Sequence, residues 1–164
     1  MIFVKPAIGL VFLALNGIGM LIPLVYVFSS ILDFADYALP GWLAWAGIVL
    51  FAFAIGLLWK SHHDLGHNWT VFVGLHHKHE LITGGVYKYI RHPMYLAHIV
   101  WALAQIMILQ NWIAGYSFLI VQIPFYFFRI KNEERMMIEQ FGTTYKAYMQ
   151  KTGRLIPGSP KIHL

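Results

Sequence analysis

The residues best suited to chemistry lie in the segment Gly84–Tyr95, which is polar and basic and is flanked by hydrophobic stretches. Gly84 and Gly85 permit close approach of a ligand to the backbone. Pro93 suits the first turn of a helix, whose free N–H groups and positive dipole end attract a carboxylate. The tyrosine rings of the segment can stack on a base or surround a cation. These groups together suit a small zwitterionic ligand with an aromatic base and a sulfonium.

A second candidate is the pair Arg129 and Glu133, which are four residues apart and therefore share a helical face. Gln122 and Tyr126 precede them on the same stripe, and a similar stripe upstream comprises His98, Trp101 and Gln105. Polar residues at membrane depth normally face a bundle interior or a cavity and are candidate functional groups. The alternative is an ion pair that closes the helix end. Glu134 is expected to be solvated, as is Arg135.

The abundant histidines raise the question of a metal site. His63 and His67 are four residues apart and could share a helical face, as metal ligands do. The chain lacks an HxxHH pair, and Lys78 stands among the other clustered histidines, where its charge would repel a metal. We therefore predict no metal site, and a histidine-rich di-iron membrane oxidase is the less favoured alternative.

The composition defines the class of protein that must position these groups. Hydrophobic residues make up 59% of the 164 residues and charged residues only 12%, about half the charged share of a soluble domain. The chain has no cysteine, which excludes disulfides and thiolate chemistry. We predict an all-α integral membrane protein with a single domain, 1–164.

Four apolar segments are predicted to span the membrane: 7–28, 41–59, 94–110 and 112–128. The last two are short and separated by Asn111-Trp112, which predicts a tight helical hairpin, with a re-entrant pair as the alternative. The domain is thus expected to divide into two N-terminal spans, a cytosolic or interfacial cofactor loop, the hairpin and a cytosolic C-terminal region, with the boundaries 1–60, 61–93, 94–128 and 129–164.

Small residues predict how the first two spans pack. Gly17 and Gly19 mark a face of the first span, and Ala52 and Gly56 form a small-xxx-small pair on the second. Near the C-terminus, Gly142 is predicted to end the helix that continues the fourth span, followed by a short interfacial helix over residues 143–151.

The charges predict the topology. Every lysine and arginine falls on one side of a four-span arrangement, which places both termini in the cytoplasm. The formal charge of +5 is explained by this orientation and by contact with anionic membrane lipids, so no nucleic-acid partner is expected.

Four short motifs carry a family resemblance. They are His79-Glu80-Leu81-Ile82-Thr83-Gly84-Gly85-Val86-Tyr87, Arg91-His92-Pro93-Met94-Tyr95, Arg129-Ile130-Lys131-Asn132-Glu133-Glu134, and Phe141-Gly142 followed by Tyr145 and Tyr148. In this order, each beside a hydrophobic stretch, they closely resemble the isoprenylcysteine carboxyl methyltransferase family and its bacterial and phospholipid methyltransferase relatives. The resemblance covers roughly residues 65–157. Ala97 departs from it, because relatives usually have glycine there.

The resemblance implies a membrane enzyme that uses S-adenosylmethionine, releases S-adenosylhomocysteine and lacks the Rossmann-type fold of soluble methyltransferases. The cofactor-binding residues that it implies are His79, Glu80, Leu81, Ile82, Tyr87, His92, Pro93, Met94, Tyr95 and Glu133. It also implies that Arg129 binds the substrate carboxylate, so that Arg129 and Glu133 are the expected catalytic residues.

The expected reaction is carboxyl methylation of an isoprenylcysteine-like acceptor, either a lipophilic small molecule or a prenylated substrate. The alternatives are N-, O- or S-methylation of a phospholipid or another small lipophile, and, in a different class, a non-catalytic membrane scaffold. The sequence leaves the oligomeric state and the role of Arg91 open.

Overall fold

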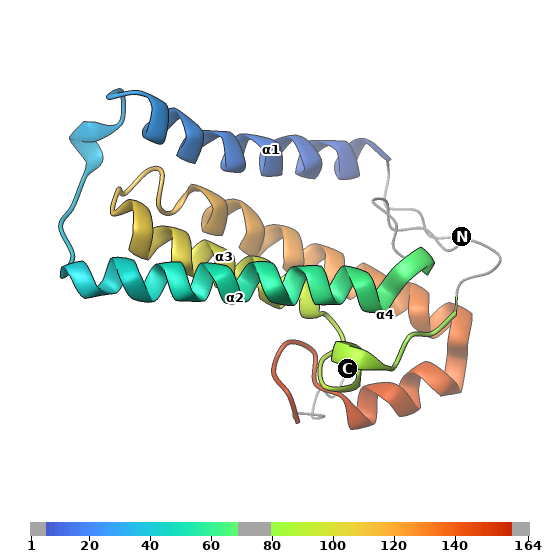
Figure 1. Ribbon diagram of the computed structural model, residues 1–164. Coiled ribbons are helices and arrows are strands. Elements are labelled where there is room, and N and C mark those ends of the chain that lie inside the picture. Colours follow the sequence, from blue (N-terminus) through green and yellow to red (C-terminus); the bar gives the residue numbers. More distant parts are fainter. Residues whose placement is uncertain (1–5, 69–79, 159–164) are drawn as a thin grey trace.

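The computed structural model describes residues 6–68 and 80–158, and the regular elements in these ranges are all helical (Figure 1). The four α-helices are α1 (Pro6–Phe28), α2 (Gly41–Leu65), α3 (Pro93–Leu109) and α4 (Ser117–Lys151). The short 3₁₀ helices are η1 (Asp33–Ala35), η2 (Gly66–Asn68) and η3 (Gly85–Lys88). The prediction of an all-helical fold is confirmed for this part of the chain.

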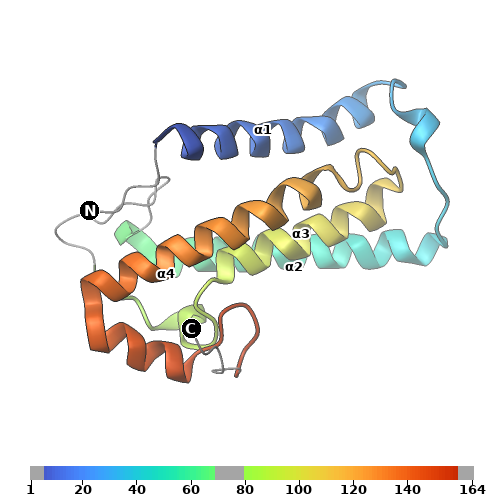
Figure 2. The same cartoon turned by 180° about the vertical axis from the view of Figure 1, so that it is seen from behind.

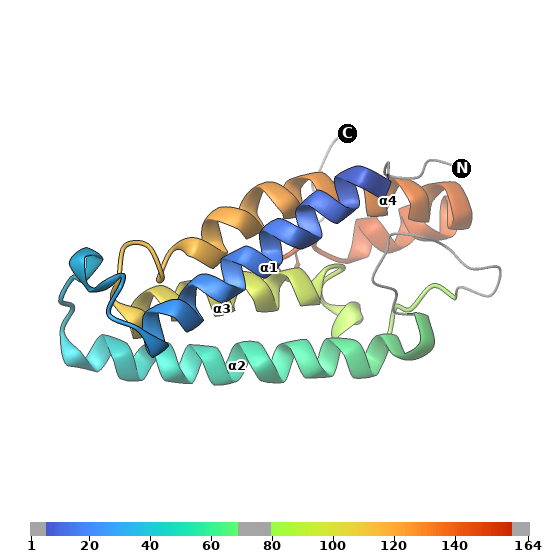
Figure 3. The same ribbon diagram turned by 90° about the horizontal axis from the view of Figure 1, so that it is seen from above.

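Consecutive long helices run in alternating directions, so that the two connections 29–40 and 110–116 lie at one end of the bundle (Figures 1 and 2). The opposite end holds the start of α1, the end of α2, η3, the start of α3 and the far part of α4. Helix α2 lies along α3, and α1 packs against α4 (Figure 3).

The α2–α3 seam is formed by small residues at every seventh position of α2. Gly47, Ala54 and Ser61 are buried, and a Cβ on Gly47 would lie 2.9 Å from both Met107 and Ile108 on α3. A seven-residue repeat keeps one face of a helix against its partner. This corrects the predicted small-residue pair, since Ala52 is exposed and Gly56 has no neighbouring atom within 4 Å of an added Cβ.

The outer surface of α2 is apolar. Its most apolar window of 18 residues has a mean hydropathy of 2.1, yet only 11% of that window is buried, whereas the core helix of a soluble protein would be mostly buried. Within the described ranges α2 is the one helix long and apolar enough to cross a membrane, because the apolar stretches Leu13–Phe28 and Pro93–Leu109 are shorter. The structure thus supports one of the four predicted spans by length and composition.

Asn111 fastens the connection between α3 and α4. Its Nδ2 donates to the carbonyl of Leu32 at 2.7 Å and to Asp36 Oδ1 at 2.8 Å, while its Oδ1 accepts from the backbone N–H groups of Ile113 and Ala114. The connection is longer than the predicted two-residue turn, because Asn111 uses its side chain to order a further loop before α4 begins at Ser117.

Helix α1 packs on α4 through Gly19. The Oγ of Ser117 donates to the Gly19 carbonyl at 3.0 Å, and a Cβ on Gly19 would lie 3.3 Å from Val121. The prediction of a packing face is therefore confirmed at Gly19, but it is wrong at Gly17, which is exposed and has no atom within 4 Å of an added Cβ.

Helix α4 is broken at Gly142, where φ is 52° and ψ is −122°. This left-handed region of φ favours glycine, which has no Cβ to clash with the backbone. The break agrees with the predicted helix end at this residue. Beyond it the chain turns back, and residues 143–151 lie beside η3 and the start of α3 (Figures 1 and 2).

Candidate functional site

A carboxylate shared between two helices forms the centre of the candidate site. Arg129 Nε donates to Glu133 Oε1 at 2.8 Å on α4, and the hydroxyl of Tyr95, in the first turn of α3, donates to the same oxygen. The Arg129 and Glu133 side chains are 24% and 23% exposed, so the pair is open to a ligand on one side. The structure therefore brings together three residues that the sequence placed in the site.

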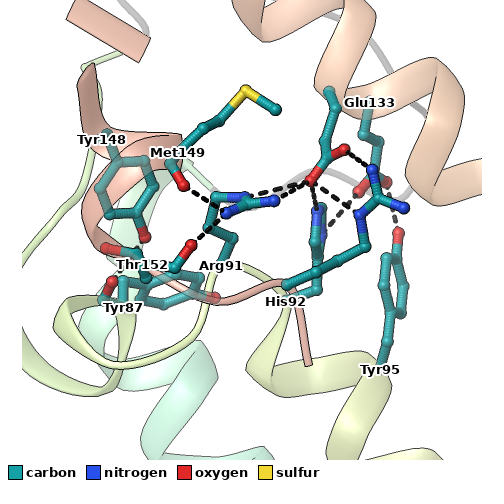
Figure 4. A network of polar contacts seen from close by, with 10 residues as sticks. Tyr87, Arg91, His92, Tyr95, Glu133, Tyr148, Met149 and Thr152 are labelled. Carbon is teal, nitrogen blue, oxygen red and sulfur yellow. Dashed lines mark hydrogen bonds and ion pairs between the residues drawn. The ribbon is translucent and has the colours of Figure 1, made fainter. Parts of the chain in front are cut away.

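His92 lies between two carboxylates at the start of α3 (Figure 4). Its Nε2 is 3.3 Å from Glu134 Oε1, its Nδ1 is 3.8 Å from Glu133 Oε2, and its ring stacks on Tyr95 with centroids 5.4 Å apart. Pro93 occupies the first helical position behind it and is fully buried. The ring of His92 is thus fixed in orientation, with one nitrogen directed at each acidic residue.

Glu134 is buried, which corrects the prediction that it is solvated. Only 4% of the residue is exposed, and it receives hydrogen bonds from Arg91 and Arg154 in addition to the contact with His92. Burial by itself raises the pKa of the carboxyl, but the bonds from His92 and Arg154 and the charge of Arg91 outweigh burial and lower the pKa to about 2. Glu134 is therefore an ionised acceptor at neutral pH.

Arg91, whose role the sequence left open, joins the start of α3 to the C-terminal segment (Figure 4). Its Nε and Nη2 lie 3.1 and 2.9 Å from Glu134 Oε1, and its Nη1 donates to the carbonyls of Met149 and Thr152. The backbone N–H of Arg91 also donates to the Gly153 carbonyl at 2.8 Å. A basic residue directly before His-Pro was the only sequence signal for this role.

The same C-terminal segment closes over Tyr87. The hydroxyl of Tyr148 donates to the Tyr87 carbonyl, and the hydroxyl of Tyr87 donates to the Ser61 carbonyl at 3.3 Å. Burial, and then the nearby Tyr148, raise the pKa of Tyr87, so its ring is a neutral phenol. Segments far apart in sequence thus enclose the predicted cofactor tyrosine.

Asp64, at the end of α2, lies close to the backbone of Gly85, in the space that a glycine leaves open. Gly85 has φ of +57°, and an added Cβ there would lie 2.1 Å from Asp64 Oδ2. The same oxygen accepts from the N–H of Val86 at 2.9 Å. Sequence reasoning assigned this space to a ligand and missed Asp64.

The remaining predicted cofactor residues differ in placement. Glu80 is exposed, and Leu81 and Ile82 are half-buried in an irregular stretch that leads to η3. Met94 is half-buried at the second position of α3. His79 lies outside the described residues.

Gln105, Gln122 and Tyr126, from the two predicted polar stripes, are all buried but differ in their contacts. Gln105 is buried and donates to the Ala114 carbonyl at 2.7 Å, so it supports the α3–α4 connection. Gln122 and Tyr126 are also buried and lie in the α4 turns that precede Arg129.

Across residues 6–68 and 80–158, no group of three histidine or acidic side chains is arranged so that it could hold a metal ion.

Comparisons with known proteins agree on one family. The model of the isoprenylcysteine carboxyl methyltransferase family matches residues 45–139. The protein-S-isoprenylcysteine O-methyltransferase of Dictyostelium discoideum is 33% identical over 135 residues, which are 81% of this chain and 54% of that protein. That of Schizosaccharomyces pombe is 38% identical over 82 residues, which are 50% of this chain and 35% of that protein.

A solved structure shows the same fold. The structure of a eukaryotic intramembrane Ras methyltransferase, an isoprenylcysteine carboxyl methyltransferase, matches with a TM-score of 0.65 at 24% identity. The match covers 99% of this chain and 56% of that one. The chain thus spans about half the length of this structure and of the Dictyostelium relative.

Proposed function

Because the chain belongs to the isoprenylcysteine carboxyl methyltransferase family, we propose that it methylates the carboxylate of a lipophilic, isoprenylcysteine-like acceptor with S-adenosylmethionine. The observation that carries this proposal is the contact of Arg129 and Tyr95 with the same oxygen of Glu133. It places one cation and one anion side by side, partly exposed, where the apolar first part of α4 gives way to its polar part beside the start of α3. An acceptor carboxylate and a sulfonium cofactor require this combination of charges.

The residues present fit such a cofactor. The carboxylate of Glu133 complements a positive charge, and contacts with Tyr95 and His92 hold this Glu133 carboxylate in one orientation. Bound S-adenosylmethionine supplies an electrophilic methyl group on a positively charged sulfur. Tyr87 and the start of α3 are the further groups of the chain that would hold it.

The chain's own residues would act by alignment. A guanidinium has five N–H donors, so Arg129 can hold Glu133 through Nε and orient an acceptor carboxylate with other donors. A carboxylate oxygen is already a nucleophile at neutral pH, so no side chain has to remove a proton when the new O–CH₃ bond forms and the S–CH₃ bond breaks. Orientation and exclusion of water can together contribute about 7–11 kcal/mol to such a transfer.

The test is methyl transfer by reconstituted protein with prenylated thiol acids and with aminophospholipids as acceptors. We expect Arg129→Ala to raise KM for the acceptor and Glu133→Ala to weaken cofactor binding measured by calorimetry, each with a loss of about 100-fold in kcat/KM. Lys131→Ala, at an exposed position between them, is the matched control. Wild-type rates in both site variants would contradict the assignment, and transfer to amines alone would replace the acceptor class.

We also propose four membrane spans, formed by α1, α2, α3 and the first part of α4, with both termini in the cytoplasm. The alternating helix directions support this topology (Figures 1 and 2). Lys60 lies in the last turns of α2, and Arg129 contacts the same carboxylate as Tyr95 in the first turn of α3, so both basic residues lie at the end of the bundle where α2 ends and α3 begins. The chain has no cysteine, so single cysteines can report the side of the membrane directly. Asp33→Cys and Lys146→Cys should react with an impermeant thiol reagent from opposite sides, and reaction from the same side would exclude the four-span topology.

A further inference from the structure

Three buried polar atoms between α3 and α4 have no hydrogen-bond partner in the part of the chain that the structure describes. They are His98 Nδ1, Gln122 Oε1 and the hydroxyl oxygen of Tyr126. Gln122 and Tyr126 are only 3% and 4% exposed. Leaving such groups unpaired costs free energy, so buried polar atoms without a partner in a native fold require an explanation.

The three atoms belong to one region beside the candidate site. Gln122 and Tyr126 are one turn apart on α4, and the ring of Tyr126 lies 6.1 Å from that of His98 and 4.5 Å from that of Tyr95. At 1.5 Å rise per residue, Tyr126 lies about 5 Å and Gln122 about 10 Å before Arg129 along α4, towards the start of this helix and away from Glu133.

The surroundings favour a neutral group rather than an ion. The His98 ring packs edge-on against Phe118, and the ring centroids of Phe118 and Trp101 are 5.8 Å apart. A charged group among these rings would lose its hydration without a counter-ion, whereas a neutral group with hydrogen bonds would not. The zwitterionic cofactor therefore belongs at Glu133, and the occupant of this deeper region belongs to a lipophilic molecule.

We propose that Gln122 and Tyr126, with His98 beside them, bind a hydroxyl group carried on the lipophilic part of the methyl acceptor. A hydroxyl donates one hydrogen bond and accepts others, so it can donate to Gln122 Oε1 and accept from the Tyr126 hydroxyl. This inference rests on the proposed function, because Arg129 must hold the acceptor carboxylate at the same time. The acceptor is then an acid whose chain carries a second, neutral polar group.

Kinetics with paired acceptors test the inference. The probes are a prenylthiopropionic acid and analogues with one hydroxyl on successive carbons of the prenyl chain. We expect the wild-type protein to favour one analogue about tenfold in kcat/KM through the acceptor KM, and Gln122→Leu and Tyr126→Phe to abolish this preference while still methylating the plain acid. Phe127→Leu, at an exposed position on the same helix, should keep the preference.

Two outcomes of these kinetics overturn the inference without touching the proposed function: methylation of the plain acid with no preference for any hydroxylated analogue, and variants that change the cofactor KM alone. If the plain acid is not methylated, the proposed function fails. Direct binding of the plain and hydroxylated acids, measured by thermal shift, then still decides whether the deeper region selects a hydroxyl.

Stability of the ligand-free protein gives an independent reading. If the atoms lack partners, Gln122→Leu and Tyr126→Phe remove a buried unpaired group, and each should raise Tm by about 2–4 °C. A buried water that already satisfies the three atoms would make both variants less stable, and this result would overturn the inference.

Discussion

Arg91 and Glu134 form a buried ion pair in which Nε and Nη2 of the arginine lie 3.1 and 2.9 Å from one carboxylate oxygen. The two residues are 43 positions apart in the sequence, and their side chains are only 4% and 5% exposed. The pair connects the start of α3, where His92 and Tyr95 face the candidate site, to the face of α4 that lies next to Glu133.

Removing Arg91 should destabilise the protein strongly. Arg91→Ala leaves Glu134 in a buried position with fewer partners, and breaking one side of a buried ion pair costs about 3–5 kcal/mol. Arg91→Lys should recover only part of this loss, because a single ammonium cannot reproduce the two-nitrogen contact and the bonds to carbonyls. Thermal unfolding in detergent measures the effect, with the exposed Arg135→Ala as a control expected to change stability by less than about 0.5 kcal/mol.

Stability should depend on acid through Glu134. Its folded-state pKa of about 2 is below the ordinary value of 4.5, so the folded state favours the ionised form. Above pH 4.5 this contribution is fully present, and it is lost as pH falls from 4.5 towards 2, because the unfolded chain then binds the proton more readily.

Unfolding measured across this pH range should show a steeper loss for the wild-type protein than for Glu134→Gln, which has no carboxyl to titrate at that position. Glu139→Gln, at an exposed position of the same helix, should follow the wild-type profile. Parallel profiles for the wild type and Glu134→Gln would show that the ion-pair cluster does not govern acid stability.

A methyl group on Gly85 should disrupt η3. Gly85→Ala places a Cβ in the space of the Asp64 carboxylate and forces a non-glycine residue into the left-handed region, which by itself costs about 1–2 kcal/mol. Gly84 is extended, with φ of −94°, and has room for a Cβ, so Gly84→Ala is the matched control. The measurements are thermal unfolding and cofactor affinity, and equal behaviour of the two variants would contradict the placement of Asp64.

Two glycines of α2 should respond to alanine with opposite signs. Gly47→Ala puts a Cβ 2.9 Å from Met107 and Ile108, and such overpacking costs about 1–3 kcal/mol. Gly56→Ala meets no atom within 4 Å, and the better helix propensity of alanine should stabilise the protein by up to about 1 kcal/mol. Opposite shifts in Tm would confirm the α2–α3 seam, and shifts of the same sign would contradict it.

Patterns within a single helix could be predicted from the sequence. The spacing of Arg129 and Glu133 defines a common face whatever the helix packs against, and Pro93 and Gly142 mark a helix start and a helix break through their own backbone preferences. The polar residues after Trp59 mark the end of the predicted apolar span 41–59. Polar residues can continue a helix beyond its apolar part, and α2 continues to Leu65, which brings Asp64 to η3.

Contacts between distant segments could not be predicted in this way. Glu134 follows Glu133 directly, and its burial depends on the C-terminal segment that folds back after Gly142 to supply Arg154. The small-residue pair at Ala52 was a local pattern, whereas the observed seam at Gly47 depends on which face of α2 meets α3. A single helix carries no information about its partner's position.

The pairing of residues 149–154 with Arg91 and His92 also sets an order of events during synthesis. A nascent chain translated as far as Lys151 already contains all four α-helices, but it lacks the Gly153 and Arg154 carbonyls that accept from the backbone of Arg91 and His92. It also lacks the Arg154 guanidinium that bonds to Glu134. The contacts of Arg91, His92 and Glu134 at the candidate site are therefore completed only after the whole of α4 has been translated.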